Sequence, residues 1–250
     1  MDERVLRERD FHDARYAGAH ESRSADRFYA INAASVSFFK RAIESAPRGS
    51  TMLDYGCGEG SYAALHAAHS GHRVIAIDIS PIAIDHARQQ AERQGVANRI
   101  DFRVMNAEEL DLESDSFDLV CGLGVIHHLD LAAAVREVAR VTRPSGAAVF
   151  VEPLGHNAVI NFYRRRTPDQ RSEDEHPLLL DDFDLLRSHF SSVDVDYFHL
   201  LGLLALPFTG HRRFREILAR LDAADRLVFR TPARRWAWMA GIRLAGPLPA

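Results

Sequence analysis

Short β-branched runs alternate with helical patterns between Thr51 and Pro153, and this alternation constrains the fold more than any other feature of the chain. Strands that alternate with helices of this length pair in parallel, because each crossover helix returns the chain to the same edge of the sheet. The five predicted strands are Met52–Tyr55, Arg73–Asp78, Asp101–Met105, Phe117–Gly122 and Ala147–Glu152. We therefore expect a doubly wound α/β fold, with helices on both faces of a mostly parallel sheet.

Two more strands are predicted at Val193–Phe198 and Trp236–Leu244, which gives a sheet of seven. Among the helices, the one that begins at Pro81 is clearly marked, because Ser80 can cap its first turn and Gly95 can end it. A single domain of this kind suits a chain of 250 residues.

Two segments lie outside this pattern. Residues 1–46 precede the first strand and end in a predicted helix, and residues 200–231 carry an apolar run followed by an Arg-rich one. Extra segments of this kind often shape the binding site of an α/β protein. We therefore divide the chain into an N-terminal lid or cap, residues 1–46, and a main domain, residues 47–250, with a substrate-shaping insert at about 200–231.

A glycine-rich turn follows the first strand, in the sequence Leu53-Asp54-Tyr55-Gly56-Cys57-Gly58-Glu59-Gly60. Glycine permits positive φ angles and the close approach of a ligand to the backbone. A dinucleotide-binding turn has two residues between its second and third glycines, and the helix that follows holds the pyrophosphate. This chain has only Glu59 there, and a carboxylate at that position repels a diphosphate.

Two carboxylates near this turn indicate the charge of the ligand. Asp78 ends the second strand, where it can accept charge-assisted hydrogen bonds from both hydroxyls of a ribose. Asp54, on the first strand, favours a ligand that carries an ammonium or a sulfonium group. Together with the glycine spacing, these residues predict a positively charged adenosine cofactor and not a dinucleotide.

With these residues the chain resembles class I S-adenosyl-L-methionine (SAM) dependent methyltransferases, in particular the small-molecule group similar to ubiquinone and menaquinone methyltransferases. The resemblance covers Leu53 to Pro153 and rests on five ordered motifs. They are the glycine-rich turn, Asp78-Ile79-Ser80, Asn106–Leu110, Phe117–Val120 with Val125–Leu129, and Glu137–Gly146. It implies a Rossmann-like fold with an antiparallel last strand, SAM as cofactor with S-adenosyl-L-homocysteine (SAH) as product, and methyl transfer of the EC 2.1.1 type.

The resemblance also assigns cofactor contacts. The expected cofactor-binding residues are Asp54, Gly56, Cys57, Gly58, Gly60, Asp78, Ile79, Asn106, Ala107, Glu108, Cys121, Gly122, Leu123, Tyr16 and Tyr29. Asp78 is expected at the ribose hydroxyls, and the backbone around Gly122 at the methionine amino group. Asn106 stands where the family commonly has Asp, and its side-chain carbonyl can still accept a hydrogen bond from the adenine amino group. An ordinary Asx turn is the alternative for Asn106, and small apolar fillers are the alternative for both cysteines.

Tyr16 and Tyr29 are expected in a lid over the cofactor, together with Phe11, His12 and Phe28, because the N-terminal segment often has this role in the resembled group. A lid excludes water, and aromatic faces attract a cationic sulfonium. The alternative is a surface helix that packs these aromatic residues on the domain.

His127 and His128 follow the fourth strand and are the candidate catalytic residues. A neutral imidazole can remove a proton near pH 7, which an alcohol or a carbon acid needs and which a phenol, carboxylate or amine does not. A structural role for the pair is the alternative, and Glu152, His156 and His176 are weaker candidates. No metal site is expected, because no pair of ligands has two further ligands at a suitable spacing.

Charge and cysteine content limit the partners and the compartment. Lys and Arg number 31 against 35 Asp and Glu, so the net charge of −4 provides no global positive field to attract nucleic acid. Two cysteines without a disulfide pattern fit a reducing cytoplasm. The longest apolar run, Phe198 to Phe208, is too short for a transmembrane segment, and residues 1–10 do not form a secretory signal.

Arginine clusters at residues 164–166 and 212–220 suggest two functions. They could hold a phosphate or carboxylate of a substrate, or make peripheral contact with an anionic membrane. Solvated helix faces are the alternative explanation.

The sequence therefore predicts a cytoplasmic methyltransferase, monomeric or homodimeric, that acts on a small molecule through an oxygen, nitrogen or carbon acceptor. A role in secondary metabolism is one interpretation. The alternative is a SAM-binding protein of the same fold that is non-catalytic or catalyses another reaction.

Overall fold

The computed structural model describes residues 2–19, 26–60 and 62–249, so residues 20–25 of the predicted lid lie outside the described part of the chain. Its centre is a seven-stranded sheet with the order β3-β2-β1-β4-β5-β7-β6. The strands are β1 (Thr51–Tyr55), β2 (Arg73–Asp78), β3 (Ile100–Val104), β4 (Phe117–Leu123), β5 (Thr142–Pro153), β6 (Phe190–Phe198) and β7 (Met239–Pro247). β7 runs antiparallel to both β5 and β6, and the pairs among β1 to β5 are parallel. The predicted fold class is confirmed, including the antiparallel last strand.

Several strand boundaries differ from the sequence prediction, among them the starts of β5 and β7. The last strand begins at Met239 and not at Trp236, because Pro232–Trp236 form a short 3-10 helix whose first turn is capped by the Thr231 hydroxyl. The fifth strand begins at Thr142 and not at Ala147, because the helix before it ends at Val141 and Thr142 already pairs with Phe117.

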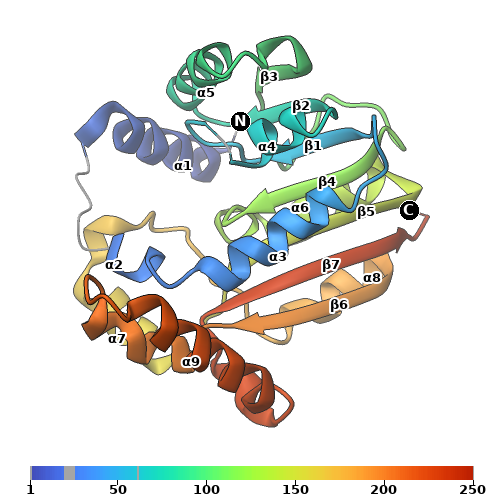
Figure 1. The fold of residues 1–250 in the computed structure, drawn as a ribbon. Helices are drawn as coiled ribbons and strands as arrows, with labels where there is room; N and C mark the ends of the chain where they lie inside the picture. Colours follow the sequence, from blue (N-terminus) through green and yellow to red (C-terminus); the bar gives the residue numbers. More distant parts are fainter. Residues whose placement is uncertain (1, 20–25, 61, 250) are drawn as a thin grey trace.

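Helices cover both faces of the sheet (Figure 1). One face carries α3 (Ala33–Glu44), α4 (Tyr62–His69) and α5 (Pro81–Arg93), and the other carries α6 (Leu131–Val141) and α8 (Asp182–His189). Ser80 caps α5 through a 3.1 Å bond from the Ala83 amide, as its sequence predicted. Since α3 packs Phe38, Phe39 and Ile43 into the main core, the second half of residues 1–46 is part of the layer that covers the sheet.

The remaining helices gather at the carboxyl end of the parallel strands (Figure 1). They are α1 (Glu3–Ala14) with a π-helical turn at Arg15–Ala19, α2 (Asp26–Tyr29), α7 (Ala158–Arg166), the 3-10 helix η5 (Leu201–Phe208) and α9 (Phe214–Val228). A separate apolar cluster joins several of them through Ile31, Ile160, Leu203, Leu218 and Trp238. No helix within the described residues is both long and apolar enough to cross a bilayer.

One buried carboxylate joins two parts of the predicted insert, α9 and the start of η5. Asp225 of α9 accepts hydrogen bonds from the amides of Leu200, Leu201 and Gly202, at 3.1, 2.8 and 3.3 Å. These amides open the 3-10 helix, where no backbone acceptor is available to them. The carboxylate thus fixes η5 against α9, and these two helices lie together at the carboxyl end of the sheet.

Candidate active site

A cavity of about 490 Å³ opens at the carboxyl edge of the sheet, between β1 and β4. Here the strand order reverses, since β2 and β3 lie to one side of β1 and β4 to the other. Ligands of open α/β sheets bind at such a switch point. The cavity wall is formed by α1, by the loops after β1 to β4, by α7 and by the start of β7.

The glycine-rich turn after β1 forms one side of the cavity. Gly56 and Gly58 have φ angles of +75° and +56°, which residues with a side chain rarely adopt. A Cβ at Gly56 would overlap the side chain of Val125, and one at Gly58 would lie 3.1 Å from the Tyr16 hydroxyl. Both glycines therefore allow close packing of the turn against neighbouring elements and against a ligand.

Asp78 lies at the end of β2 and contacts this turn. Its two carboxylate oxygens accept hydrogen bonds from the amides of Gly58 and Ser80, at 2.8 and 2.9 Å. Burial raises the pKa of Asp78, while these hydrogen bonds partly offset the shift. Each oxygen keeps a further lone pair, so the carboxylate can also accept hydrogen bonds from a ligand in the cavity. Asp54 of β1 is buried nearby and accepts the Ala64 amide at 2.9 Å.

Most of the predicted cofactor-binding residues line the cavity. Those that do are Tyr16, Tyr29, Asp54, Gly56, Cys57, Gly58, Asp78, Ile79, Asn106, Ala107, Glu108 and Leu123. Gly60, Cys121 and Gly122 are not among the lining residues. A Cβ at Gly60 would overlap Gln90 of α5, and the Cys121 thiol is buried 3.5 Å from the Leu53 carbonyl. These three residues have evident packing roles, and their predicted cofactor contacts stay predictions.

The loop after β3 shows the Asx turn that the sequence left open. The side-chain oxygen of Asn106 accepts the Glu108 amide at 3.1 Å. Glu108 in turn accepts the Asp130 amide at 2.8 Å and forms an ion pair with Arg4 of α1. The Ala107 carbonyl accepts the Tyr55 hydroxyl, so this side of the cavity is held from both the sheet and the N-terminal helix.

His127 forms a buried pair with Glu152. Its Nδ1 lies 2.6 Å from Oε2 of Glu152, whose other oxygen accepts the amides of Val125 and Ile126 at 2.9 and 3.1 Å. Burial raises the pKa of Glu152 to about 7 and lowers the pKa of His127 to about 4. With the Nδ1 proton directed to the carboxylate, Nε2 is the nitrogen that can accept a proton. Glu152 was only a weak candidate from the sequence.

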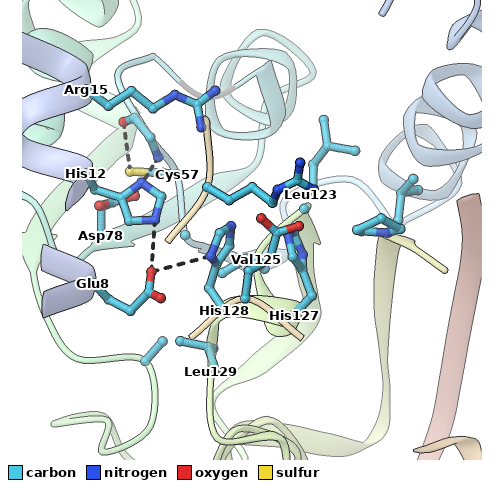
Figure 2. A pocket seen from close by; sticks show the side chains of 18 of the residues that line it. Glu8, His12, Arg15, Cys57, Asp78, Leu123, Val125, His127, His128 and Leu129 are labelled. Carbon is cyan, nitrogen blue, oxygen red and sulfur yellow. Dashed lines mark hydrogen bonds and ion pairs between the residues drawn. The ribbon is translucent and has the colours of Figure 1, made fainter. Parts of the chain in front are cut away.

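His128 contacts a different partner, Glu8 of α1. Its Nδ1 lies 3.4 Å from Oε2 of Glu8 and 3.3 Å from the Ser172 hydroxyl. His12, one turn along α1, contacts the same carboxylate oxygen of Glu8, with its Nε2 3.6 Å away (Figure 2). Glu8 was not among the residues predicted from the sequence, although its spacing of four residues from His12 places both on one face of a helix.

Helix α1 is fixed across the cavity by polar contacts along its length. Arg4 reaches the His128 carbonyl at 3.2 Å, Arg7 forms two 3.1 Å bonds to Asp174, and Asp13 accepts the Ser80 hydroxyl. The position of α1 fits the predicted lid.

The far wall of the cavity is aromatic with one charged pair. Phe28 packs on Tyr163 and Trp238, with ring centroids 4.6 and 5.8 Å apart. Arg164 lies 3.5 Å from Glu175, and both line the cavity. Of the predicted arginine clusters, Arg164 lines the cavity and the members at 165–166 and 212–220 do not.

The comparisons with known proteins agree with this geometry. A family model described as "Methyltransferase domain" matches residues 53–150. The ubiquinone biosynthesis O-methyltransferase of Methylocella silvestris is 42% identical over 105 residues, which is 40% of this chain and 40% of that protein. The chain thus matches less than half the length of the curated relatives.

Solved structures share the fold over most of the chain. Phosphoethanolamine N-methyltransferase 2 of Haemonchus contortus, in complex with SAM, matches with a TM-score of 0.65 and 17% identity over 96% of this chain and 60% of that one. The [4+2]-cyclase SpnF matches with a TM-score of 0.58 and 19% identity over 84% of this chain and 81% of that one. At these identities the likeness concerns the fold alone. Residues 53–150 of this chain therefore match a methyltransferase domain by sequence, and the sheet around them has the fold of a SAM-bound methyltransferase.

Proposed function

We propose that this protein transfers a methyl group from SAM to a small-molecule acceptor. The observation that carries the proposal is that one cavity joins the glycine-rich turn and Asp78 to the buried pair of His127 and Glu152. The glycine-rich turn and Asp78 suit the cofactor, and the pair of His127 and Glu152 suits the removal of a proton from a substrate.

The residues present fit SAM. Asp78 offers carboxylate lone pairs for the ribose hydroxyls, and Gly56 and Gly58 leave the backbone open to close approach. Asp54 and Asp78 place two carboxylates around the turn, which favours a ligand with an ammonium and a sulfonium and disfavours a diphosphate. Tyr16, in the π-helical turn after α1, covers the glycine-rich turn. When bound, SAM supplies an electrophilic methyl group on sulfur.

The acceptor portion of the cavity suits an aromatic or apolar small molecule with a polar group. Phe28, Tyr163 and Trp238 supply apolar surface, while Arg164 and Glu175 supply one paired charge. An acceptor atom near Nε2 of His127 could lose its proton to the imidazole as it is methylated. Alignment of acceptor and methyl group in one cavity supplies the rest of the catalysis.

The alternative is another reaction, or none, on the same scaffold. The fold alone does not decide this, since the [4+2]-cyclase SpnF also has it. The His127–Glu152 pair favours a reaction that includes proton transfer, because a buried carboxylate that orients an imidazole is costly unless it has a use.

We further propose a cytoplasmic, monomeric or homodimeric enzyme without a nucleic-acid or membrane partner. The two free, buried thiols and the negative net charge support this proposal.

Calorimetry with SAH tests cofactor binding. We expect binding by the wild type and a loss of at least about tenfold in Asp78→Ala, since a charge-assisted hydrogen bond is worth about 1.5–3 kcal/mol. Asp85→Ala, an exposed carboxylate on the adjacent α5, is the matched control and should bind like the wild type. Tighter binding of NAD than of SAH would overturn the proposal.

A second assay tests the reaction. Small-molecule acceptors, each with a hydroxyl, amine or activated carbon, are incubated with the enzyme and methyl-labelled SAM. Label in an acceptor, at a rate that falls in His127→Ala, supports methyl transfer. SAH binding without labelled product from any class of acceptor supports the alternative function.

A further inference from the structure

We propose that Glu8, His12 and His128 form a binding site for a divalent transition-metal ion of the zinc type in the wall of the cavity. One ligand atom from each residue lies within 4.8 Å of the other two. Two of the residues come from α1 and the third from the loop after β4 (Figure 2). The site therefore forms only when α1 lies across the carboxyl edge of the sheet.

The distances in this cluster fit metal ligands better than hydrogen bonds. Oε2 of Glu8 lies 3.6 Å from Nε2 of His12 and 3.4 Å from Nδ1 of His128. Hydrogen bonds between such groups are about 2.7–3.2 Å long. Around a tetrahedral zinc ion with bonds of about 2.0–2.2 Å, neighbouring ligand atoms lie about 3.3–3.6 Å apart. The two observed separations agree with this value.

The burial of Glu8 supports the same conclusion. The residue is 5% exposed, and within the described residues neither of its oxygens, nor Nδ1 of His12, has a hydrogen-bond partner. A buried carboxylate without hydrogen bonds is costly. Arg4, which precedes Glu8 by four residues on α1, is directed instead to Glu108 and the His128 carbonyl. A cation between the three side chains would satisfy the carboxylate.

The donor set indicates the kind of ion. Two imidazoles and one carboxylate suit zinc and neighbouring first-row metals, whereas Mg²⁺ and Ca²⁺ prefer oxygen ligands alone. Three protein ligands also leave a position open for water or a substrate atom, as in catalytic zinc sites. Because Glu8, His12 and His128 all line the cavity, that position would face the substrate. Metal binding at this site does not depend on which reaction the enzyme catalyses.

The alternative is a cluster in which a protonated imidazole balances Glu8 and no metal binds. Ser172 favours this reading, because its hydroxyl lies 3.3 Å from the same nitrogen of His128. The two possibilities differ in metal uptake, which can be measured directly.

The experiment uses tag-free, chelator-treated protein of residues 1–250, titrated with Co²⁺, whose visible absorption reports the coordination geometry. We expect one Co²⁺ per chain with the intense bands of a four- or five-coordinate site, displaced by one equivalent of Zn²⁺. Glu8→Gln, His12→Gln and His128→Gln should each weaken Co²⁺ binding by more than about 100-fold. Loss of a residue that only hydrogen-bonds to a metal ligand already costs about 10–100-fold, and loss of a ligand costs more. His66→Gln removes a histidine from a surface pair with Glu44, 3.0 Å apart, and should bind like the wild type.

Thermal unfolding with and without Zn²⁺ separates loss of the site from loss of the fold. Zn²⁺ should raise the melting temperature of the wild type and of His66→Gln, and leave that of Glu8→Gln unchanged. SAH titration of the same proteins tests the cofactor site independently, so failure of the metal site and failure of the proposed function give different results. The proposal would be overturned if the folded wild type gave no Co²⁺ band, or if all three ligand variants bound Co²⁺ as tightly as the wild type.

Discussion

The carboxylate of Glu152 lies 2.6 Å from Nδ1 of His127, at the end of β5 and fully buried. Its second oxygen accepts two backbone amides from the loop that carries the histidine. The carboxylate therefore fixes both the loop and the imidazole, and its acceptor character places the proton on Nδ1. In this arrangement Glu152 is a positioning residue and His127 is the group that can take a proton from a substrate.

We predict that Glu152→Gln lowers kcat by about 10²–10⁴-fold on an acceptor that must lose a proton. The amide can donate a hydrogen bond to Nδ1 and so favour the tautomer whose Nε2 carries the proton and cannot act as a base. SAH affinity should stay within about twofold of the wild type, because Asp78 and the glycine-rich turn are untouched. Turnover and calorimetry on the same preparation measure the two effects.

The pH profile gives a second readout of this pair. Since burial raises the pKa of Glu152 to about 7, the wild-type rate should rise as the pH passes 7 and flatten above it, when the carboxylate is ionised. Glu152→Gln should lack this rise. Full activity of Glu152→Gln, or an unchanged profile, would assign the pair a structural role only.

We predict that SAH slows amide hydrogen exchange in residues 3–19 by at least about tenfold. His12 and Tyr16 line the cavity, and Arg4 and Asp13 of α1 hold it to the loops after β4 and β2 through polar contacts that a ligand would reinforce. Peptides from α8, on the other side of the sheet, provide the internal control and should exchange equally with and without SAH. Equal protection of residues 3–19 in both states would make α1 a fixed wall and not a lid.

The sheet and the glycine-rich turn could be predicted from the sequence because their signals are local. β-branched runs mark each parallel strand, and the spacing of Gly56, Gly58 and Gly60 with Asp78 is contained in a short stretch of chain. The carboxyl ends of β1, β2 and β4 meet by topology alone, so residues after them share one cavity.

The pairing of Glu8 with His128 could not be predicted, because 120 residues separate them and α1 has no strand to fix its place. Its position depends on tertiary contacts such as those of Arg4 with Glu108 and Arg7 with Asp174. The role of Glu152 in orienting His127 could not be predicted either, because nothing in the sequence distinguishes a buried acid at the end of a strand from a solvated one.

We predict that Asn106→Asp increases the affinity for SAH about fivefold. The Asn106 side chain already accepts the Glu108 amide, and a carboxylate keeps that bond while it offers a second, charged acceptor to the adenine amino group. A charge-assisted hydrogen bond exceeds a neutral one by about 1 kcal/mol, which corresponds to this factor. Asn106→Ala is the control and should bind more weakly than the wild type. Weaker binding by Asn106→Asp would show that the residue serves the turn and not the adenine.

The last prediction concerns His199, which is 1% exposed and has a φ of +64°. Its Nε2 contacts the Ser35 hydroxyl at 2.9 Å, whereas Nδ1 has no hydrogen-bond partner among the described residues, with Asp222 3.9 Å away. Burial lowers the pKa of His199 to about 4. In the unfolded chain a histidine titrates near 6.5, so between pH 6.5 and 4 the unfolded state binds a proton that the folded state does not, and stability falls as the pH falls.

From pH 7 to pH 5 this histidine should therefore remove about 2 kcal/mol from the free energy of unfolding. His199→Asn removes the titrating group, tolerates the positive φ and keeps an amide for Ser35, so its unfolding free energy should fall by about 2 kcal/mol less than that of the wild type over the same range. Urea denaturation at both pH values measures the difference, and the change contributed by His127 cancels because that residue is present in both proteins. His176→Asn, at an exposed histidine, should follow the wild type. Equal pH dependence of His199→Asn and the wild type would mean that His199 takes up its proton without unfolding, and that Asp222 compensates the charge in the folded state.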